Sequence, residues 1–276
     1  MSDGPPAPAG SPEGGPLGED PGTEPGRGAM ASGPPRTARE LGLATATVVV
    51  GFGILTACLV AFGSLAEDVR SKDVFLVDAW ATPFLHGIAS PPMDAVMNAF
   101  TALGTAFVIL PALVVLGAWL LRTGRTRSLA FLIVASLGSL LLQLVLKPFF
   151  ARPRPGVPYA QILSDYSFPS GHTLSAVVFY GGVALVIWSL FGRRAGLAAV
   201  AVSAIIALCV GVSRIYLGYH FVTDVLGAML AGVAWLLIVG ATFRAQPTWR
   251  RWRSRTPAAG EPARSGRAGV PMRPRG

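Results

Sequence analysis

Long apolar runs alternate with short polar segments along this chain, and the pattern predicts a bundle of membrane-spanning helices. A bilayer core of roughly 30 Å needs about 20 predominantly apolar residues in one helix. Six runs have about that length: 41–63, 99–121, 128–146, 172–191, 195–213 and 221–243. The sequence therefore predicts an all-α fold, an integral membrane bundle of six transmembrane helices.

Arginine clusters lie at alternate ends of these runs and predict how the bundle is oriented. They stand before the first run, between the second and third, between the fourth and fifth, and after the sixth. Basic flanks are retained on the cytoplasmic side. Both termini are therefore expected in the cytoplasm of a multi-pass protein of the plasma membrane. The segments 64–98, 147–171 and 214–220 then face the extracytoplasmic side.

The composition excludes an ordinary soluble domain. Of the 276 residues, 52% are hydrophobic and 13% are charged, and the mean hydropathy is +0.54. The net charge of +9 comes from arginines spread over loop ends and the C-terminal tail, so we expect no nucleic-acid partner. Residues 1–38 and the basic segment 246–276 lack apolar periodicity. They are predicted to be largely disordered cytoplasmic tails of a membrane domain at 39–245.

The first outer segment, 64–98, mixes acidic residues such as Asp78 with aromatic residues such as Trp80 and Phe84. This mixture is typical of a helix that lies in the membrane interface, so a short interfacial helix is expected in this loop. His86 stands at its end and is expected to be an interfacial polar residue.

Three polar strings interrupt the apolar pattern, and all of them fall on the predicted outer side. They are KPFFARPRP at 147–155, PSGH at 169–172 and SRIYLGYHFVTD at 213–224. The first carries Lys147, Arg152 and Arg154, against the charge rule. Snorkelling toward lipid headgroups is one open explanation. An anionic ligand is the other, because guanidinium and ammonium groups bind phosphate.

The second string stands immediately before an apolar run. Ser170 is expected to be the N-cap of that helix. Free backbone N–H groups at a helix start, together with Gly171, which allows close approach, predict a phosphate cradle into which His172 points. For this string alone, a plain serine cap beside an interfacial histidine stays open.

The third string places His220 and Asp224 four residues apart at the start of an apolar run, so one helix face is expected to carry both. A carboxylate within a membrane span needs a partner, and the histidine supplies one. A carboxylate on one ring nitrogen fixes the tautomer and leaves the other nitrogen free to attack. This pair therefore favours His220 as a nucleophile.

Together the three strings resemble the signature of the type 2 phosphatidic acid phosphatase superfamily, which includes lipid phosphate phosphatases and vanadium haloperoxidases. The family patterns are KxxxxxxRP, PSGH and SRxxxxxHxxxD. They fall on Lys147, Arg154 and Pro155, on Pro169 to His172, and on Ser213, Arg214, His220 and Asp224. With the helix layout the likeness extends over about residues 41–243.

The resemblance implies hydrolysis of a lipid-linked phosphate or diphosphate at the outer membrane–water interface, through a phosphohistidine and without a metal or cofactor. His220 would attack phosphorus, Asp224 would orient it, and His172 would act first as acid and then as base. The resemblance also assigns the residues that hold the phosphoryl oxygens: Lys147, Arg154, Ser170, Gly171 and Arg214.

Phosphatidic acid, phosphatidylglycerophosphate and polyprenyl diphosphate are all open as substrates, membrane lipids are the other expected partners, and the oligomeric state is left open. A vanadium haloperoxidase-like enzyme would share the pocket, but such relatives are soluble and six apolar runs argue against it. A lipid-phosphate binding or transport protein would keep the pocket without turnover. The complete set of His172, His220 and Asp224 argues against that.

Other polar residues receive simpler interpretations. Arg152 lies outside the family pattern and is expected to be an accessory phosphate or headgroup contact. Asp165 is expected to be solvated, and Gln143 to bond a neighbouring helix. Three aromatic residues near His220 are expected to anchor the chain at the membrane interface. They are Tyr216, Tyr219 and Phe221.

Overall fold

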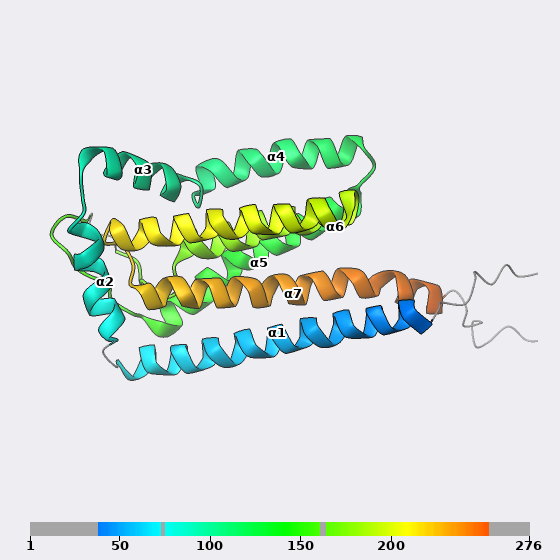
Figure 1. Ribbon diagram of the computed structural model, residues 1–276, viewed down its shortest axis with the longest axis horizontal. Helices are drawn as coiled ribbons and strands as arrows, with labels where there is room; N and C mark the ends of the chain where they lie inside the picture. Colours follow the sequence, from blue (N-terminus) through cyan, green and yellow to red (C-terminus); the bar gives the residue numbers. More distant parts are fainter. Residues whose placement is uncertain (1–37, 73–74, 161–163, 254–276) are drawn as a thin grey trace, which may run out of the picture. The chain divides into compact units, whose positions relative to one another are not determined.

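A computed structural model describes residues 38–72, 75–160 and 164–253. Every regular element in this part of the chain is a helix (Figure 1). The helices are α1 (Ala38–Ser71), α2 (Leu76–His86), α3 (Pro91–Ala102), α4 (Ala106–Arg122), α5 (Thr126–Phe150), α6 (Gly171–Tyr216) and α7 (Val222–Arg253). The predicted all-α class is confirmed. The predicted tails lie almost wholly outside the described residues, although α7 continues into the second as far as Arg253.

The long helix α6 consists of two arms that fold back on each other at Gly192. This glycine has φ 83°, a left-handed value that side chains disfavour. A Cβ atom at position 196 would lie 2.5 Å from the Trp188 side chain, and one at position 211 would lie 3.8 Å from Thr173. Both pairs are symmetric about Gly192, so the arms are antiparallel. The arms correspond to the predicted runs 172–191 and 195–213.

The prediction of one continuous helix over 99–121 is wrong, because the chain breaks between α3 and α4. The two helices are bent by 47°. At the break, Gly104 lies so close to α6 that a Cβ atom there would be 2.8 Å from the His172 carbonyl oxygen and 2.9 Å from Val210. The hydroxyl of Tyr180 also donates to the Leu103 carbonyl, at 3.0 Å. The break thus lets a backbone turn pack directly against the start of α6.

Four of the described helices are long and apolar enough to cross a membrane, or five if the bent pair α3 and α4 counts as one span. Large apolar side chains cover their outer faces: Phe107 is 91% exposed, Val48 70% and Val114 70%. Water disfavours such a surface, whereas a hydrocarbon environment solvates it. The chain is a multi-pass membrane protein. Its first helix is longer than predicted and continues past residue 63 to Ser71.

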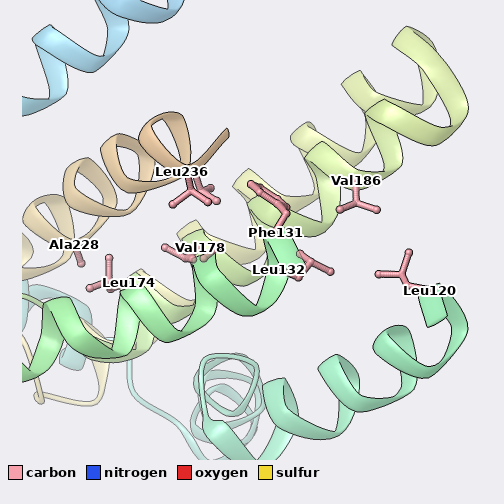
Figure 2. Packing of buried hydrophobic residues seen from close by; sticks show 10 residues of the cluster. Leu120, Phe131, Leu132, Leu174, Val178, Val186, Ala228 and Leu236 are labelled. Carbon is pink, nitrogen blue, oxygen red and sulfur yellow. The ribbon is translucent and has the colours of Figure 1, made fainter. Parts of the chain in front are cut away.

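A buried apolar cluster holds α5, α6 and α7 together, with Leu120 of α4 at its edge (Figure 2). Leu132 of α5 and Leu174 and Val178 of α6 are fully buried in it. Gly138 of α5 lies so close to Trp235 of α7 that a Cβ atom there would be 1.9 Å from the indole ring. This packing fixes the ends of α5, α6 and α7, from which the polar strings extend.

Helix α2 lies across one end of α6 and α7 and packs against both (Figure 1). A helix was predicted in this segment, and its Trp80 and Phe84 side chains are indeed exposed. Its acidic residue, however, faces the protein, since Asp78 is only 5% exposed. Helix α2 is therefore part of the wall behind the third polar string.

Candidate active site

The structure brings the three polar strings together at the end of the bundle where α6 begins and ends. The backbone N–H of Ser170 donates to the Asp224 carbonyl at 3.1 Å. Arg154 Nη1 lies 3.3 Å from Nε2 of His220. A Cβ atom at Gly171 would lie 3.9 Å from Cε of Lys147. Residues up to 77 positions apart in sequence thus share one site.

His220 and Asp224 form a buried pair at the start of α7. Their side chains are 1% and 0% exposed, and Nδ1 of the histidine lies 3.4 Å from Oδ2 of the carboxylate. The same oxygen accepts the backbone N–H of Phe221 at 2.9 Å. The predicted shared helix face is wrong, because His220 stands before α7 begins at Val222. The carboxylate instead binds both the ring and the helix start, and Nε2 is left facing Arg154.

Burial lowers the pKa of His220 from 6.5 to about 4. The neighbouring carboxylate of Asp224 acts in the opposite direction, while the positive charges of Arg214 and Arg154 lower the pKa further. The ring is therefore neutral at neutral pH. With Asp224 beside Nδ1, this is the protonation state in which Nε2 carries a lone pair, which faces Arg154 Nη1 at 3.3 Å.

Arg214 places a buried cation with a free donor in the same site. The residue is 5% exposed, its Nη1 donates to Thr101 Oγ1 at 3.0 Å, and its guanidinium lies 4.2 Å from the ring centre of Tyr219. Among the described residues, no hydrogen-bond acceptor reaches its buried Nε. Buried donors are normally satisfied, so this atom indicates a place for an acceptor such as a phosphoryl oxygen.

His172 lies in the first turn of α6, within electrostatic reach of the other site residues. The charges of Arg214, Lys147 and Arg154 all act on it. It stands one residue after Gly171, at a helix start whose first N–H groups have no partner within the helix. A histidine, cations and free backbone donors therefore converge at this end of α6.

The predicted capping bond of Ser170 is absent: the residue is at the N-cap position of α6, but its side chain caps no described N–H group. Its hydroxyl instead accepts a hydrogen bond from Thr173 Oγ1 at 3.0 Å. The predicted bond of Gln143 to a neighbouring helix is confirmed, because its Nε2 donates to Ser175 Oγ at 3.1 Å. A Cβ atom at Gly171 would lie 2.5 Å from the end of this glutamine side chain, so a larger residue there would have to displace it.

Asp165 is exposed, as expected, with half of its side chain accessible to solvent, and it also pairs with two of the predicted phosphate-binding cations. Its carboxylate bonds Lys147 and lies 2.6 Å from Arg154 Nη2. Burial acts to raise the pKa of Asp165, but the bonds and charges of Lys147 and Arg154 outweigh it and lower the pKa to about 2. The Asp165 carboxylate thus binds the same two cations that are predicted to bind the phosphate of the substrate.

Arg152 was expected to contact phosphate or lipid headgroups, and this is wrong. Its Nη1 lies 2.5 Å from Asp224 Oδ1, and its Nη2 lies 2.8 Å from Asp78 Oδ2. Its guanidinium also lies 4.4 Å from the ring centre of Phe221. Asp78 is a site residue that the sequence reasoning missed. The available signal was an acidic residue within an apolar stretch, which needs a partner.

The predicted interfacial anchoring of Tyr216 is also wrong. This residue is 1% exposed, and its hydroxyl donates to Asp94 Oδ1 of α3 at 2.6 Å. Its neighbours Tyr219 and Phe221 lie beneath arginines of the site. The aromatic residues of the third string therefore pack within the protein and support its cations.

An apolar cavity of about 890 Å³ lies between α1, α5, α6 and α7, lined among others by Phe52, Phe131 and Leu236. None of the predicted site residues lines it. Phe131 and Lys147 are sixteen positions apart on α5, which corresponds to about 24 Å along a helix. The predicted site residues therefore lie elsewhere, at the polar end of the bundle.

The chain is similar to known membrane phosphatases over the part that forms this site. The PAP2 superfamily matches residues 128–248. Phosphatidylglycerophosphatase B of Bacillus subtilis (strain 168) is 34% identical over 177 residues, which are 63% of this chain and 87% of that protein. Undecaprenyl-diphosphatase BcrC of the same organism is 28% identical over 170 residues, 58% of this chain and 78% of that protein.

A solved structure gives the same result. The crystal structure of a transmembrane PAP2-type phosphatidylglycerolphosphate phosphatase from Bacillus subtilis has a TM-score of 0.65 and 30% identity, covering 69% of this chain and 96% of that one. Fold and site define a multi-pass membrane protein with a histidine–carboxylate pair set among cations. The chain belongs to the PAP2 superfamily, and the resemblance of its three strings is confirmed.

Proposed function

We propose that this protein hydrolyses a lipid-linked phosphate or diphosphate through a phosphohistidine intermediate. The observation that carries the proposal is the buried His220–Asp224 pair, whose Nδ1 side faces the carboxylate at 3.4 Å and whose Nε2 faces Arg154 at 3.3 Å. A neutral imidazole held in this way is a nucleophile beside a cation that can bind the phosphoryl group.

In the first step, Nε2 of His220 forms a bond to phosphorus while the bond from phosphorus to the leaving oxygen breaks. His172 donates a proton to that oxygen, and Asp224 stabilises the positive charge on the His220 ring. In the second step, water attacks phosphorus and loses a proton to His172, the N–P bond breaks, and inorganic phosphate and neutral His220 result.

The cations stabilise the charge that phosphoryl transfer spreads over the equatorial oxygens. Arg154 lies at Nε2, and Arg214 offers its buried Nε, which has no partner in the described part of the chain. Lys147 and the backbone at Ser170 and Gly171 complete the proposed set. Because these fixed charges surround one nucleophile, the scheme needs no metal ion.

We assign the substrate to lipids, because the site lies at the ends of apolar helices. A lipid can keep its tail in the hydrocarbon while its phosphate reaches the helix ends. The relatives are named for phosphatidylglycerophosphate and for undecaprenyl diphosphate. Together with phosphatidic acid, these two lipid classes are the candidate substrates.

We further propose six membrane crossings, with both arms of α6 crossing and with α3 and α4 forming one bent crossing. The turns that follow α4 and the first arm of α6 carry arginines and lie at the end of the bundle opposite α2 (Figure 1). The positive-inside rule then puts both termini in the cytoplasm and the site at the outer face of the plasma membrane. In a background without Cys58 and Cys209, a cysteine at Ala160 should react with a membrane-impermeant reagent in intact cells, and one at Thr123 should not. The reverse labelling would overturn this orientation.

The activity is tested with purified protein in EDTA. Phosphate release from lipid phosphates and its inhibition by orthovanadate are expected. Acid-quenched protein should carry a histidine-bound phosphate that the His220→Ala variant lacks. A panel of phosphatidic acid, phosphatidylglycerophosphate and polyprenyl diphosphate identifies the substrate, and binding of all three without phosphate release would overturn the proposal.

A further inference from the structure

A buried ion network lies behind the His220–Asp224 pair. Arg152 binds Asp224 with one terminal nitrogen, at 2.5 Å, and Asp78 with the other, at 2.8 Å. The side chains of Arg152, Asp78 and Asp224 are 13%, 6% and 0% exposed. The network therefore joins α2, the segment after α5 and the first turn of α7, away from water.

Asp78 also holds the start of α7. Its Oδ1 accepts the backbone N–H of Thr223 at 3.0 Å, and its Oδ2 accepts the Thr223 hydroxyl at 2.5 Å. The first N–H groups of a helix have no partner within the helix. A carboxylate at that end also interacts favourably with the helix dipole. Asp78 thus caps α7 from another helix, next to the residue that contacts His220.

The charges of the network explain why a second carboxylate is needed. Arg152 and Asp224 alone would have no net charge, so Arg152 would cancel the carboxylate that stabilises a cationic His220. Asp78 restores one net negative charge to the group. Because the three side chains are nearly buried, this charge is weakly screened.

We propose that Asp78 is a positioning residue of the reaction, which acts through Arg152 and the start of α7 to keep Asp224 oriented and negatively charged behind His220. This role rests on the proposed function. It makes Arg152 a support of the nucleophile pair, whereas Lys147, Arg154 and Arg214 remain the phosphate-binding cations.

The direct test is Asp78→Asn in the full chain, which removes the charge and keeps the size of the side chain. Asp78 does not touch the proposed phosphate ligands, so kcat should fall on the order of 10- to 100-fold while KM changes less than about threefold. Asp68→Asn is the matched control, because it removes the same charge from an exposed position of α1 and should leave both constants unchanged. An unchanged kcat in Asp78→Asn overturns the proposal.

A double-mutant cycle tests whether the effect passes through Arg152. In an Arg152→Gln background, the further change Asp78→Asn should slow the reaction by a smaller factor than it does in the wild type, because only its contact with the start of α7 is then left to lose. Two fully additive losses would mean that Asp78 acts independently of Arg152. Should Asp78→Asn fail to fold, Arg152→Lys replaces it. A lysine keeps the charge but lacks the planar fork whose two terminal nitrogens each reach one carboxylate, so kcat should fall, and an unchanged kcat would overturn the proposal.

A spectroscopic measurement separates this role from the proposed function. In ¹⁵N-histidine spectra at neutral pH, with His220 assigned through His220→Asn, the wild type should show the proton on Nδ1. Asp78→Asn should raise the share of the Nε2–H tautomer, since Asp224 is less well held. This shift in a protein that releases no phosphate would refute the function and support the positioning role. If the wild type is active and Asp78→Asn changes neither the tautomer of His220 nor kcat, only the positioning role is refuted.

Discussion

Asp165 competes with substrate in the proposed site, because its carboxylate occupies Lys147 and Arg154. Replacing it with asparagine keeps the shape of the side chain and removes the anion. We expect Asp165→Asn to bind phosphate more tightly, since the two cations no longer have to release a carboxylate first. The chemical step should be unaffected, because Asp165 has no described contact with His220 or His172.

The size of the effect follows from the pKa of Asp165, about 2 against an ordinary value of 3.8. At 1.36 kcal/mol per pH unit this difference corresponds to about 2.5 kcal/mol of interaction with its surroundings. The side chain is 50% exposed, so solvent screening reduces the usable part to about 1 kcal/mol. That free energy equals about a fivefold change in affinity.

The assay is competitive inhibition by inorganic phosphate of the hydrolysis of a short-chain lipid phosphate, at constant pH and ionic strength. The inhibition constant and KM should both fall about fivefold in Asp165→Asn, with kcat unchanged. Asp68→Asn controls for the change in net charge. An inhibition constant that rises, or does not move, would refute the competition and show that Asp165 helps to arrange the cations.

Three further predictions concern other parts of the molecule. Attack needs neutral His220, whose pKa is about 4. As the pH is lowered, kcat/KM should therefore stay constant and decline only near pH 4. A decline that begins at pH 6.5 would show a histidine with an unperturbed pKa. As the pH is lowered, His220 takes up its proton in the unfolded chain at a higher pH than in the folded protein. The free energy of unfolding should therefore decrease as the pH falls from 6.5 to 4, as denaturant titration can measure. Gly104→Ala would place a methyl group 2.8 Å from the His172 carbonyl, and this variant should lose about 1–3 kcal/mol of stability together with activity. Gly63 has open space around it, so Gly63→Ala should behave as wild type in thermal unfolding and turnover.

The three strings could be recognised as one candidate site because each string is local and its pattern is specific, and the structure brings them together; the roles of their residues stay predictions. The two apolar arms of α6 were also predictable, since an arginine pair interrupts the hydrophobic run close to Gly192. The partners of Arg152 and Asp165 were not predictable in this way. Arg152 and Asp78 are separated by 74 positions, and nothing in the hydrophobic pattern specifies which loop meets which helix end.

Asp78 and Asp224 are both buried carboxylates, but their sequence contexts differ. Asp224 stands in a run long enough to span a membrane, so its charge required a partner. Asp78 stands in an apolar stretch too short to span a membrane, and other acidic residues precede it, so the same signal is weaker there. The break between α3 and α4 could not be predicted either, because it depends on the close approach of Gly104 to His172.

The antiparallel arms of α6 impose a constraint on the length of the chain. PSGH stands at the start of the first arm and Arg214 near the end of the second, and they meet because the arms have matching lengths on either side of Gly192. One residue inserted into a single arm would displace everything beyond it by about 1.5 Å and rotate it by about 100°. His172 and Arg214 would then no longer face the same space. Insertions in this hairpin are therefore tolerable only at the turn itself, where a longer connection leaves the facing of both arms unchanged.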